Sequence, residues 1–219
     1  MTIKTMIKFI QNLYYFSWLS VLAQWISCTI FLRPYFHLIK NTQIEFVGMK
    51  PDPNENYIVV SNHRSYSDPP LLGFAIDRPT AFVAKQELFS NPFLYLYMVL
   101  TSTIAINREN PESKTFKAAK KALSTVTALG AWSLGIFIEG TRSKDPDKLG
   151  QPNKGAMFLA KLTKSKIIPI GISYRGEKQI IVKIGEPYEI DYKADLDDQS
   201  WDCLEKIAGL CDYQLPERA

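Results

Sequence analysis

The sequence predicts an α/β fold: a single domain with a mostly parallel central sheet flanked by helices, plus an N-terminal membrane-associated helix. Short apolar, β-branched runs alternate with helical patterns along most of the chain, which is typical of such sheets. The first part differs, because it is apolar and aromatic without that alternation. We therefore divide the 219 residues, 46% of them apolar, into a membrane-associated segment, 1–41, and one α/β domain, 42–219.

The N-terminal segment has the composition of a helix that inserts into a membrane. Residues 9–32 carry no charge, and a helix of this length would extend roughly 36 Å, enough to cross a bilayer core. Its tyrosines and tryptophans are typical of the membrane interface, and positive charges flank both ends. We expect insertion from one side, with both ends on the cytoplasmic face, ahead of a true span or a large core helix. Pro34 is expected to end this helix, and the α/β domain is expected to fold without it.

The α/β pattern can be justified element by element. Each predicted strand is a short apolar or β-branched run bounded by polar or turn residues. These runs are residues 43–48, 57–60, 80–84, 104–106, 134–138, 167–172 and 179–184. The predicted helices have apolar residues three and four apart, or begin at a proline that suits a helix start. They are residues 69–76, 93–100, 111–129, 153–162 and 197–210.

Charge and cysteine content limit the possible partners and chemistry. A net charge of +4 and a pI near 8.8 favour anionic partners such as phosphates, acidic lipid surfaces or an acidic carrier, but are too weak to indicate nucleic acid. Three cysteines without a CxxC pair indicate a reduced, cytoplasm-facing protein. The chain has only two histidines, His37 and His63, so no zinc site is expected.

The first candidate site lies in the turn after residues 57–60. His63 follows the predicted strand, and Asp68 precedes Pro69, where a helix is expected to begin. A bend between strand and helix can bring these two side chains together. A carboxylate held against one imidazole nitrogen supports the proton that the other nitrogen takes up, which makes a general base. The plainer alternative is that Asp68 only caps the helix and that His63 is an ordinary polar residue.

The second candidate site follows the predicted strand 134–138 and consists of Glu139, Gly140, Thr141 and Arg142. The glycine lets a ligand approach the backbone, the hydroxyl donates hydrogen bonds, and the arginine makes bidentate contacts with phosphate or carboxylate. Lys85 and Arg108 also follow predicted strands, and α/β proteins bind ligands at the carboxyl ends of strands. Cations around one histidine suit an anionic substrate. The alternative is a polar turn with an internal Glu–Arg pair.

Four blocks of sequence resemble those of the glycerolipid acyltransferases. Asn62-His63, four residues and Asp68 resemble their NHx4D block, and Glu139-Gly140-Thr141-Arg142-Ser143 resembles their EGTRS block. Residues 104–108 resemble the second block and Ile168-Pro169-Ile170 the fourth, in the same order. The resemblance is nearest to the bacterial PlsC type, the 1-acyl-sn-glycerol-3-phosphate acyltransferases. Ser102 stands where the family usually has glycine, and Ile138 where many members have proline.

The resemblance implies transfer of a fatty acyl group from a thioester, acyl-CoA or acyl carrier protein, to the sn-2 hydroxyl of lysophosphatidic acid. The product would be phosphatidic acid, an intermediate of phospholipid biosynthesis. His63 would be the base and Asp68 would orient it, with no metal or cofactor. The residues implied to bind substrate are Asn62, Lys85, Arg108, Glu139, Gly140, Thr141 and Arg142. The protein would work at the cytoplasmic face of a membrane, with the bilayer as partner, and an acyl carrier protein if that is the donor.

Other functions remain open from the sequence. A non-catalytic membrane module that binds anionic lipid headgroups would need the cations but not His63 or Asp68. A lipid hydrolase would use water in place of the acceptor hydroxyl, although the chain has no GxSxG nucleophile elbow. A different lysophospholipid is a further alternative for the acceptor.

Overall fold

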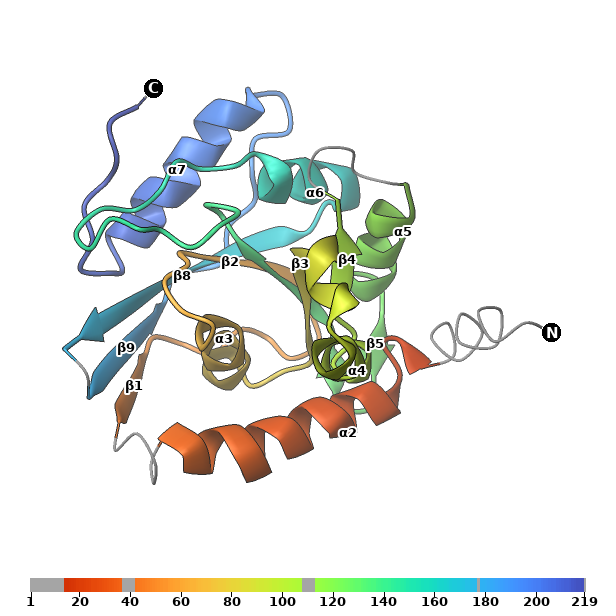
Figure 1. Cartoon of the computed structure of the whole chain (residues 1–219). Coiled ribbons are helices and arrows are strands. Elements are labelled where there is room, and N and C mark those ends of the chain that lie inside the picture. The colour runs from red at the N-terminus through yellow and green to blue at the C-terminus, as the bar shows by residue number, and fades with distance from the viewer. Residues whose placement is uncertain (1–13, 37–41, 108–112, 177, 219) are drawn as a thin grey trace.

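One seven-stranded sheet organises the computed structural model, which describes residues 14–36, 42–107, 113–176 and 178–218 (Figure 1). The strands are β1 (Gln43–Val47), β2 (Tyr57–Ser61), β3 (Thr80–Lys85), β4 (Ile104–Ile106), β7 (Ser133–Phe137), β8 (Lys166–Arg175) and β9 (Gln179–Ile184). Their order across the sheet is β1-β9-β8-β2-β7-β3-β4. Neighbouring strands are parallel except β8 and β9, which form an antiparallel hairpin. The mostly parallel sheet expected from the sequence is confirmed.

Helices cover both faces of this sheet (Figure 1). The helices are α2 (Trp18–Ile26), α3 (Asp68–Ile76), α4 (Pro92–Leu100), α5 (Ser113–Ala122), α6 (Gly155–Thr163) and α7 (Leu196–Ala208), with a 3₁₀ helix, η3 (Gln86–Ser90), before α4. The helices α6 and α7 lie above the sheet in Figure 1, and α3 lies below it, with α2 beneath. This arrangement buries the central strands on both sides, as parallel sheets require.

The strand β2 separates two hydrophobic cores. Ile58 and Val60 point into the core under α5, α6 and α7, whereas Tyr57 and Val59 point into the core against α3. All five residues of β2 are buried, which explains why its sequence is a continuous apolar run rather than an alternating one. The strand that leads into the His63 turn is thus fixed from both faces of the sheet.

The long amphipathic helix expected over residues 111–129 is wrong in its second half. The helix α5 ends at Ala122, and the chain then forms a small hairpin of β5 (Val126–Thr127) and β6 (Gly130–Ala131). Val126 and Leu129, which match the helical spacing, are exposed on this hairpin. The β-branched Val126 and Thr127 favour a strand, and Gly130, with a φ of 111°, adopts a backbone conformation that other residues rarely take.

The N-terminal helix also differs from the expected one. The chain turns at Tyr15–Ser17, where Phe16 has a left-handed φ of 62°, and α2 begins only at Trp18. Helical structure continues through the π-helix η1 (Ser27–Leu32) and past Pro34 to Phe36, so Pro34 does not end it. In this wider turn the Arg33 N–H donates to the Cys28 carbonyl, so the bonding pattern that proline would break is already displaced. Residues 9–13 lie outside the described part of the chain.

This segment is part of the folded domain. Phe16 is 4% exposed and packs edge-on against Trp132, while Val21 joins the same core. The Gln24 amide donates to the Thr80 and Thr101 carbonyls at 3.1 and 2.8 Å and accepts from the Thr80 N–H. Removing this segment would uncover part of a core, which argues against independent folding of residues 42–219; that expectation stays a prediction. Among the described residues, no helix is long and apolar enough to cross a membrane.

Candidate active site

The His63 turn has the geometry expected of a general base with its orienting carboxylate. His63 lies two residues beyond β2, and Asp68 is the first residue of α3. The His63 Nδ1 and Asp68 Oδ2 atoms are 2.7 Å apart. The imidazole stacks on the Phe137 ring, with centroids 4.0 Å apart, which fixes the plane of the ring. Because Nδ1 is held by the carboxylate, Nε2 is the nitrogen left to exchange a proton with a substrate.

Asp68 is completely buried, and donors surround its carboxylate. Its Oδ2 atom also accepts the backbone N–H groups of Arg64 and Ser65, at 2.6 and 2.7 Å. Its Oδ1 atom accepts the Tyr174 hydroxyl at 2.5 Å. The side chain thus bonds to the preceding turn and does not simply cap α3. These hydrogen bonds and the ion pair with His63 compensate for the burial of the carboxylate.

Glu139 holds the backbone of the histidine. Its Oε1 accepts the His63 N–H and its Oε2 accepts the Gly150 N–H, both at 2.9 Å. The Ser143 N–H donates to the His63 carbonyl at 2.9 Å, so both backbone groups of the histidine are bonded to the segment after β7. Burial raises the pKa of the Glu139 carboxyl, and the two backbone bonds oppose that rise. Neither carboxylate oxygen faces the cavity described below, so the structure favours a supporting role for Glu139 over the substrate contact expected from the sequence.

Asn62 has a similar position. Its side-chain amide donates to the Ile172 carbonyl at 2.9 Å and accepts the Ile172 N–H at 2.8 Å, which joins the end of β2 to β8. The residue is fully buried and does not line the cavity. In the structure, Asn62 therefore fixes the start of the His63 turn, and its predicted substrate contact stays a prediction.

Arg142 and Tyr66 form the exposed side of the site. The Arg142 guanidinium lies 3.8 Å from the centroid of the Tyr66 ring, and its Nη2 donates to the Tyr66 hydroxyl at 3.0 Å. Gly140, with a left-handed φ of 66°, lets the chain turn after β7 so that Thr141 and Arg142 reach the cavity wall. These three residues of the second predicted site are thus brought together with His63.

Of the two other predicted cations, Lys85 and Arg108, the structure describes only the first. Lys85 ends β3 and lines the same cavity as His63, as its place after a strand suggests. Arg108 lies outside the described residues.

Ser102, which stands where the acyltransferase pattern has glycine, has the left-handed φ of 55° that glycine adopts most easily. Its buried hydroxyl accepts the Phe16 N–H. The substitution therefore keeps the turn and adds a bond to the N-terminal segment.

An apolar cavity of about 840 Å³ opens beside His63. It runs between the strand ends, α2, α4, α5 and the start of α6, with a mostly apolar lining. Representative lining residues are Phe82, Leu94, Met98, Ile106, Phe116 and Phe158. Cys28 also lines it, and burial raises the pKa of this thiol to about 11. Such a cavity suits a flexible hydrocarbon chain whose reactive end lies at the histidine.

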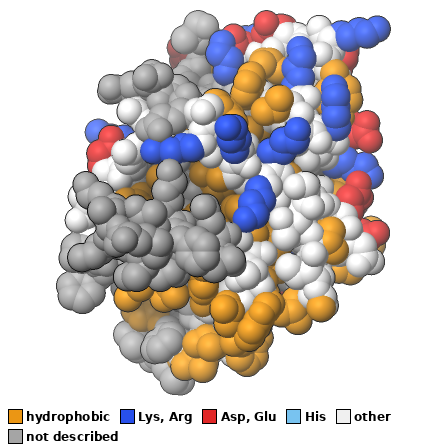
Figure 2. Space-filling model, turned by 90° about the vertical axis from the view of Figure 1, so that its right-hand side faces the viewer, with side chains coloured by type: hydrophobic (Ala, Val, Ile, Leu, Met, Phe, Trp, Pro, Cys, Tyr) orange, Lys and Arg blue, Asp and Glu red, His pale blue; other side chains and the backbone are white. Residues whose placement is uncertain are grey.

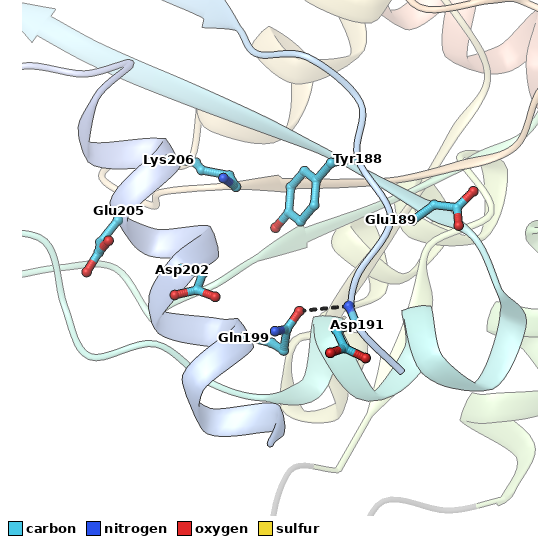
Figure 3. A pocket seen from close by; sticks show the side chains of 7 residues that line it. All are labelled: Tyr188, Glu189, Asp191, Gln199, Asp202, Glu205 and Lys206. Atoms are coloured by element: carbon cyan, nitrogen blue, oxygen red, sulfur yellow. Dashed lines mark hydrogen bonds between the residues drawn. The ribbon is translucent and has the colours of Figure 1, made fainter. Parts of the chain in front are cut away.

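A second hollow lies between α7 and the segment after β9 (Figure 3). It has a volume of about 520 Å³, and the Gln199 side chain accepts the Asp191 N–H across it at 3.1 Å. Its lining residues are Tyr188, Glu189, Asp191, Gln199, Asp202, Glu205 and Lys206. The described residues contain no group of three or more His, Cys, Asp or Glu side chains placed to hold a metal ion. None of the predicted site residues lies in this hollow.

Several residues of the site were not predicted. Tyr174 and Phe137 touch the His63–Asp68 pair from neighbouring strands, and Tyr66 stacks on Arg142. Tyr66 lies inside the NHx4D block and could have been chosen as an aromatic next to a cationic site. Tyr174 has no comparable signal, because its approach to Asp68 depends on the pairing of β2 with β8.

A mostly parallel α/β sheet thus carries a histidine–carboxylate pair at its strand ends, beside an apolar cavity whose lining includes Lys85 and Arg142. A sequence model of the Acyltransferase family matches residues 43–173, and the chain belongs to that family. This matched region contains His63, Asp68 and Arg142.

The relatives and solved structures support the same family. The chain is 28% identical over 169 residues to a 1-acyl-sn-glycerol-3-phosphate acyltransferase of Streptococcus pneumoniae, covering 73% of this chain and 59% of the relative. It is 31% identical over 156 residues to the enzyme of that name from Saccharomyces cerevisiae, covering 69% and 50%. The chain thus spans between half and three fifths of the length of these relatives. The crystal structure of the LPA acyltransferase PlsC from Thermotoga maritima has a TM-score of 0.59 and 22% identity, covering 93% of this chain and 91% of that one, which shows the shared fold.

Proposed function

We propose that the protein transfers a fatty acyl group from a thioester to the sn-2 hydroxyl of lysophosphatidic acid, forming phosphatidic acid for phospholipid biosynthesis. The observation that carries this proposal is the His63–Asp68 pair at the wall of an apolar cavity whose other walls include Arg142 and Lys85. The names of the relatives, 1-acyl-sn-glycerol-3-phosphate acyltransferase, support this activity. A headgroup-binding module would not need a buried carboxylate bonded to a histidine that lines the cavity.

The proton path follows from the two imidazole nitrogens. Nε2 of His63 takes the proton of the acceptor hydroxyl as its oxygen attacks the thioester carbonyl carbon. The carbon–oxygen bond forms, the carbon–sulfur bond then breaks, and the departing thiolate takes the proton back from Nε2. Asp68 stabilises the imidazolium in between through its bond to Nδ1. The acceptor hydroxyl is itself the nucleophile, so the reaction requires no acyl-enzyme intermediate.

The ends of the lysolipid match two different parts of the site. Its phosphate would bind Arg142 and Lys85, with Arg108 as the third cation expected from the sequence, because arginine pairs well with phosphate oxygens. Thr141 and Gly140, which line the cavity beside Arg142, would contact the glycerol or the thioester. The acyl chain would lie in the apolar cavity, where burial stabilises it by about 0.8 kcal/mol per methylene group relative to water.

We also propose that the protein works at the cytoplasmic face of a membrane. The outer side of α2 exposes Trp18 and Trp25, at 61% and 60%, and α4 exposes Leu94, Leu96 and Tyr97. Figure 2 shows the side of the molecule on the right of Figure 1, where Lys and Arg side chains gather above hydrophobic ones. Apolar and aromatic side chains beside cations suit insertion into one leaflet with anionic headgroups.

The donor is acyl-CoA or acyl carrier protein, and both are anionic. The helix α5 carries Lys114, Lys117, Lys120 and Lys121 and no acidic residue, and its Phe116 lines the cavity. Either the phosphates of CoA or the acidic surface of a carrier protein would be attracted to this helix. No metal or cofactor takes part in the proposed reaction.

The test is an assay of the purified protein with labelled acyl-CoA and lysophosphatidic acid in vesicles. We expect labelled phosphatidic acid, which His63→Ala abolishes. Labelled free fatty acid would instead identify a hydrolase, and the absence of both products, with acyl-CoA and with acyl carrier protein as donor, would favour a headgroup-binding module. Replacing the acceptor by other lysophospholipids in the same assay decides which one is preferred.

A further inference from the structure

The two oxygens of Asp68 have different partners. Oδ2 accepts from His63 Nδ1 and from two backbone N–H groups of the turn. Oδ1 accepts the hydroxyl of Tyr174, at 2.5 Å, from a strand 106 residues away in the sequence. Asp68 is fully buried, and the Tyr174 hydroxyl links its carboxylate to the strand β8.

We propose that Tyr174 is a positioning residue for the acyl transfer. Its hydroxyl fixes the Asp68 carboxylate and shares its negative charge, so that Asp68 orients His63 without making it too strong a base. This inference rests on the proposed function for its catalytic meaning, but its structural basis is the hydrogen-bonded chain from Tyr174 through Asp68 to His63. Tyr174 itself needs no contact with substrate.

Tyr174 is held in place from behind. Its backbone N–H donates to the Tyr213 hydroxyl at 3.1 Å, and the Tyr213 ring lies under the Arg64 guanidinium, 3.7 Å from it. Arg64 in turn donates to the carbonyls of Asp145 and Lys148, the second at 2.8 Å. Burial and the Asp68 carboxylate both raise the pKa of Tyr174 well above its usual range, so the phenol remains a donor at every working pH.

The charge on Asp68 matters because His63 must be unprotonated before it can accept a proton from substrate. Other charged groups near the turn are Glu139 on the His63 N–H, and Arg64 and Arg142 on the flanking residues. Lys85 and Lys154 line the same cavity as His63. A hydrogen bond to a carboxylate stabilises its charged form and weakens its attraction for a neighbouring imidazolium. Without the Tyr174 bond, Asp68 would hold a proton on His63 more strongly, and more of the enzyme would be in the inactive, protonated form at low pH.

The experiment compares the pH dependence of Tyr174→Phe with that of the wild type. We expect kcat to fall about tenfold, with KM for both substrates unchanged, because the base is less well positioned. We expect the acid limb of the kcat/KM profile to move to higher pH by about half a unit. Tyr57→Phe, which removes a phenol hydroxyl that donates to the Glu55 carboxylate and not to Asp68, is the matched control and should leave the acid limb in place. An acid limb unmoved by Tyr174→Phe would overturn the inference.

A second variant guards against loss of folding. Site-specific replacement of Tyr174 by 3-fluorotyrosine keeps the ring and makes the hydroxyl a stronger donor, so the acid limb should move to lower pH, opposite to the phenylalanine variant. A role in packing alone would give no such reversal. A shift in the same direction for both variants, or none for either, would contradict the proposal.

A readout without catalysis separates this inference from the proposed function. In protein with ¹⁵N-labelled histidine, the His63 signals are assigned by their loss in His63→Ala, and the pH midpoint of their titration is followed by NMR. Tyr174→Phe should move this midpoint upward. If the midpoint moves but the wild type forms no phosphatidic acid, the proposed function fails and the Tyr174 contact stands. If the wild type is active and the midpoint stays, only this inference fails.

Discussion

The two halves of the site are built in opposite ways. The half that handles the proton is enclosed: Asp68 is fully buried, and both of its oxygens accept hydrogen bonds from neighbouring groups. The half that would bind phosphate is open: Tyr66 is 74% exposed, and Arg142 and Lys85 lie on the surface. The enclosed half therefore has its geometry before substrate arrives, whereas the open half can adjust to it.

This difference has an energetic reason. A buried carboxylate without donors would cost several kcal/mol, so the turn around Asp68 must form completely or not at all. Surface cations keep their hydration until a phosphate replaces it, so they can be left free of acidic partners at low cost. Substitutions in the enclosed half should therefore change catalysis, and substitutions in the open half should change affinity and substrate choice.

The largest effect should come from Asp68→Asn. An asparagine has no negative charge to stabilise the imidazolium. Its NH₂ group would also face a donor that now bonds to a carboxylate oxygen. By analogy with the same change in the orienting aspartate of serine proteases, kcat should fall about 10⁴-fold. The assay is initial rate of phosphatidic acid formation at saturating substrate. Asp77→Asn, at the other end of α3 and exposed, is the control; a fall of less than tenfold for Asp68→Asn would contradict the general-base mechanism.

Arg142→Ala should affect affinity more than turnover. A hydrogen bond to a charged group contributes roughly 1.5–3 kcal/mol, so KM for lysophosphatidic acid should rise roughly tenfold to a hundredfold. The effect should disappear with an acceptor that lacks the phosphate. The neighbouring exposed Lys144→Ala serves as the matched control for loss of one positive charge. An equal loss on both acceptors would show that Arg142 supports the turn and does not bind phosphate.

Glu139→Gln tests whether the EGTRS glutamate belongs to the enclosed half. Its amide oxygen can accept one of the two N–H groups that now donate to the carboxylate, from His63 and Gly150, but not both. A buried N–H left without a partner costs about 1–3 kcal/mol, so we expect a lower melting temperature and roughly tenfold lower kcat. The measurements are thermal unfolding and steady-state kinetics. An increase in KM alone would restore the substrate contact predicted from the sequence.

The smallest effect concerns Cys28 in the cavity wall. Because burial raises the pKa of its thiol to about 11, the reactive thiolate is scarce at neutral pH and rises about tenfold per pH unit below that value. N-ethylmaleimide should therefore inactivate the enzyme slowly at pH 7 and about tenfold faster at pH 8, as the adduct fills the cavity. Residual activity against time gives the rates. Cys28→Ser should remove this inactivation; if it does not, another cysteine is responsible.

The sequence was sufficient for the local parts of the site. The strand, the turn and the start of α3 lie within twenty or so residues, and strand-end residues of parallel neighbours share one edge, so the His63–Asp68 pair and the position of Lys85 could be predicted. Tyr174 could not, because its contact with Asp68 depends on the register of β2 against β8. Glu139 and Asn62 were assigned to substrate because a polar residue type does not reveal which way its side chain points.

The N-terminal segment shows a different limit. Its apolar composition correctly marks residues that avoid water, but water is avoided both in a core and in a membrane. Phe16 and Val21 pack into the protein core, whereas Trp18 and Trp25 are exposed. The turn at Phe16 and the Gln24 hydrogen bonds set which side of the segment faces the core. The helical spacing that extended α5 to Leu129 failed for a related reason, since a hairpin can carry the same apolar positions.

The distribution of the four tryptophans gives the protein a built-in optical probe. Trp18 and Trp25 point away from the domain, whereas Trp132 is fully buried against Phe16 and Trp201 is partly covered on α7. Fluorescence from water-exposed indoles is red-shifted relative to buried ones, so the emission of the free protein combines both kinds. Docking of α2 onto a vesicle would shift the emission to shorter wavelength, whereas unfolding would expose Trp132 and shift it to longer wavelength. The direction of the emission shift in a single sample thus distinguishes membrane-bound protein from unfolded protein.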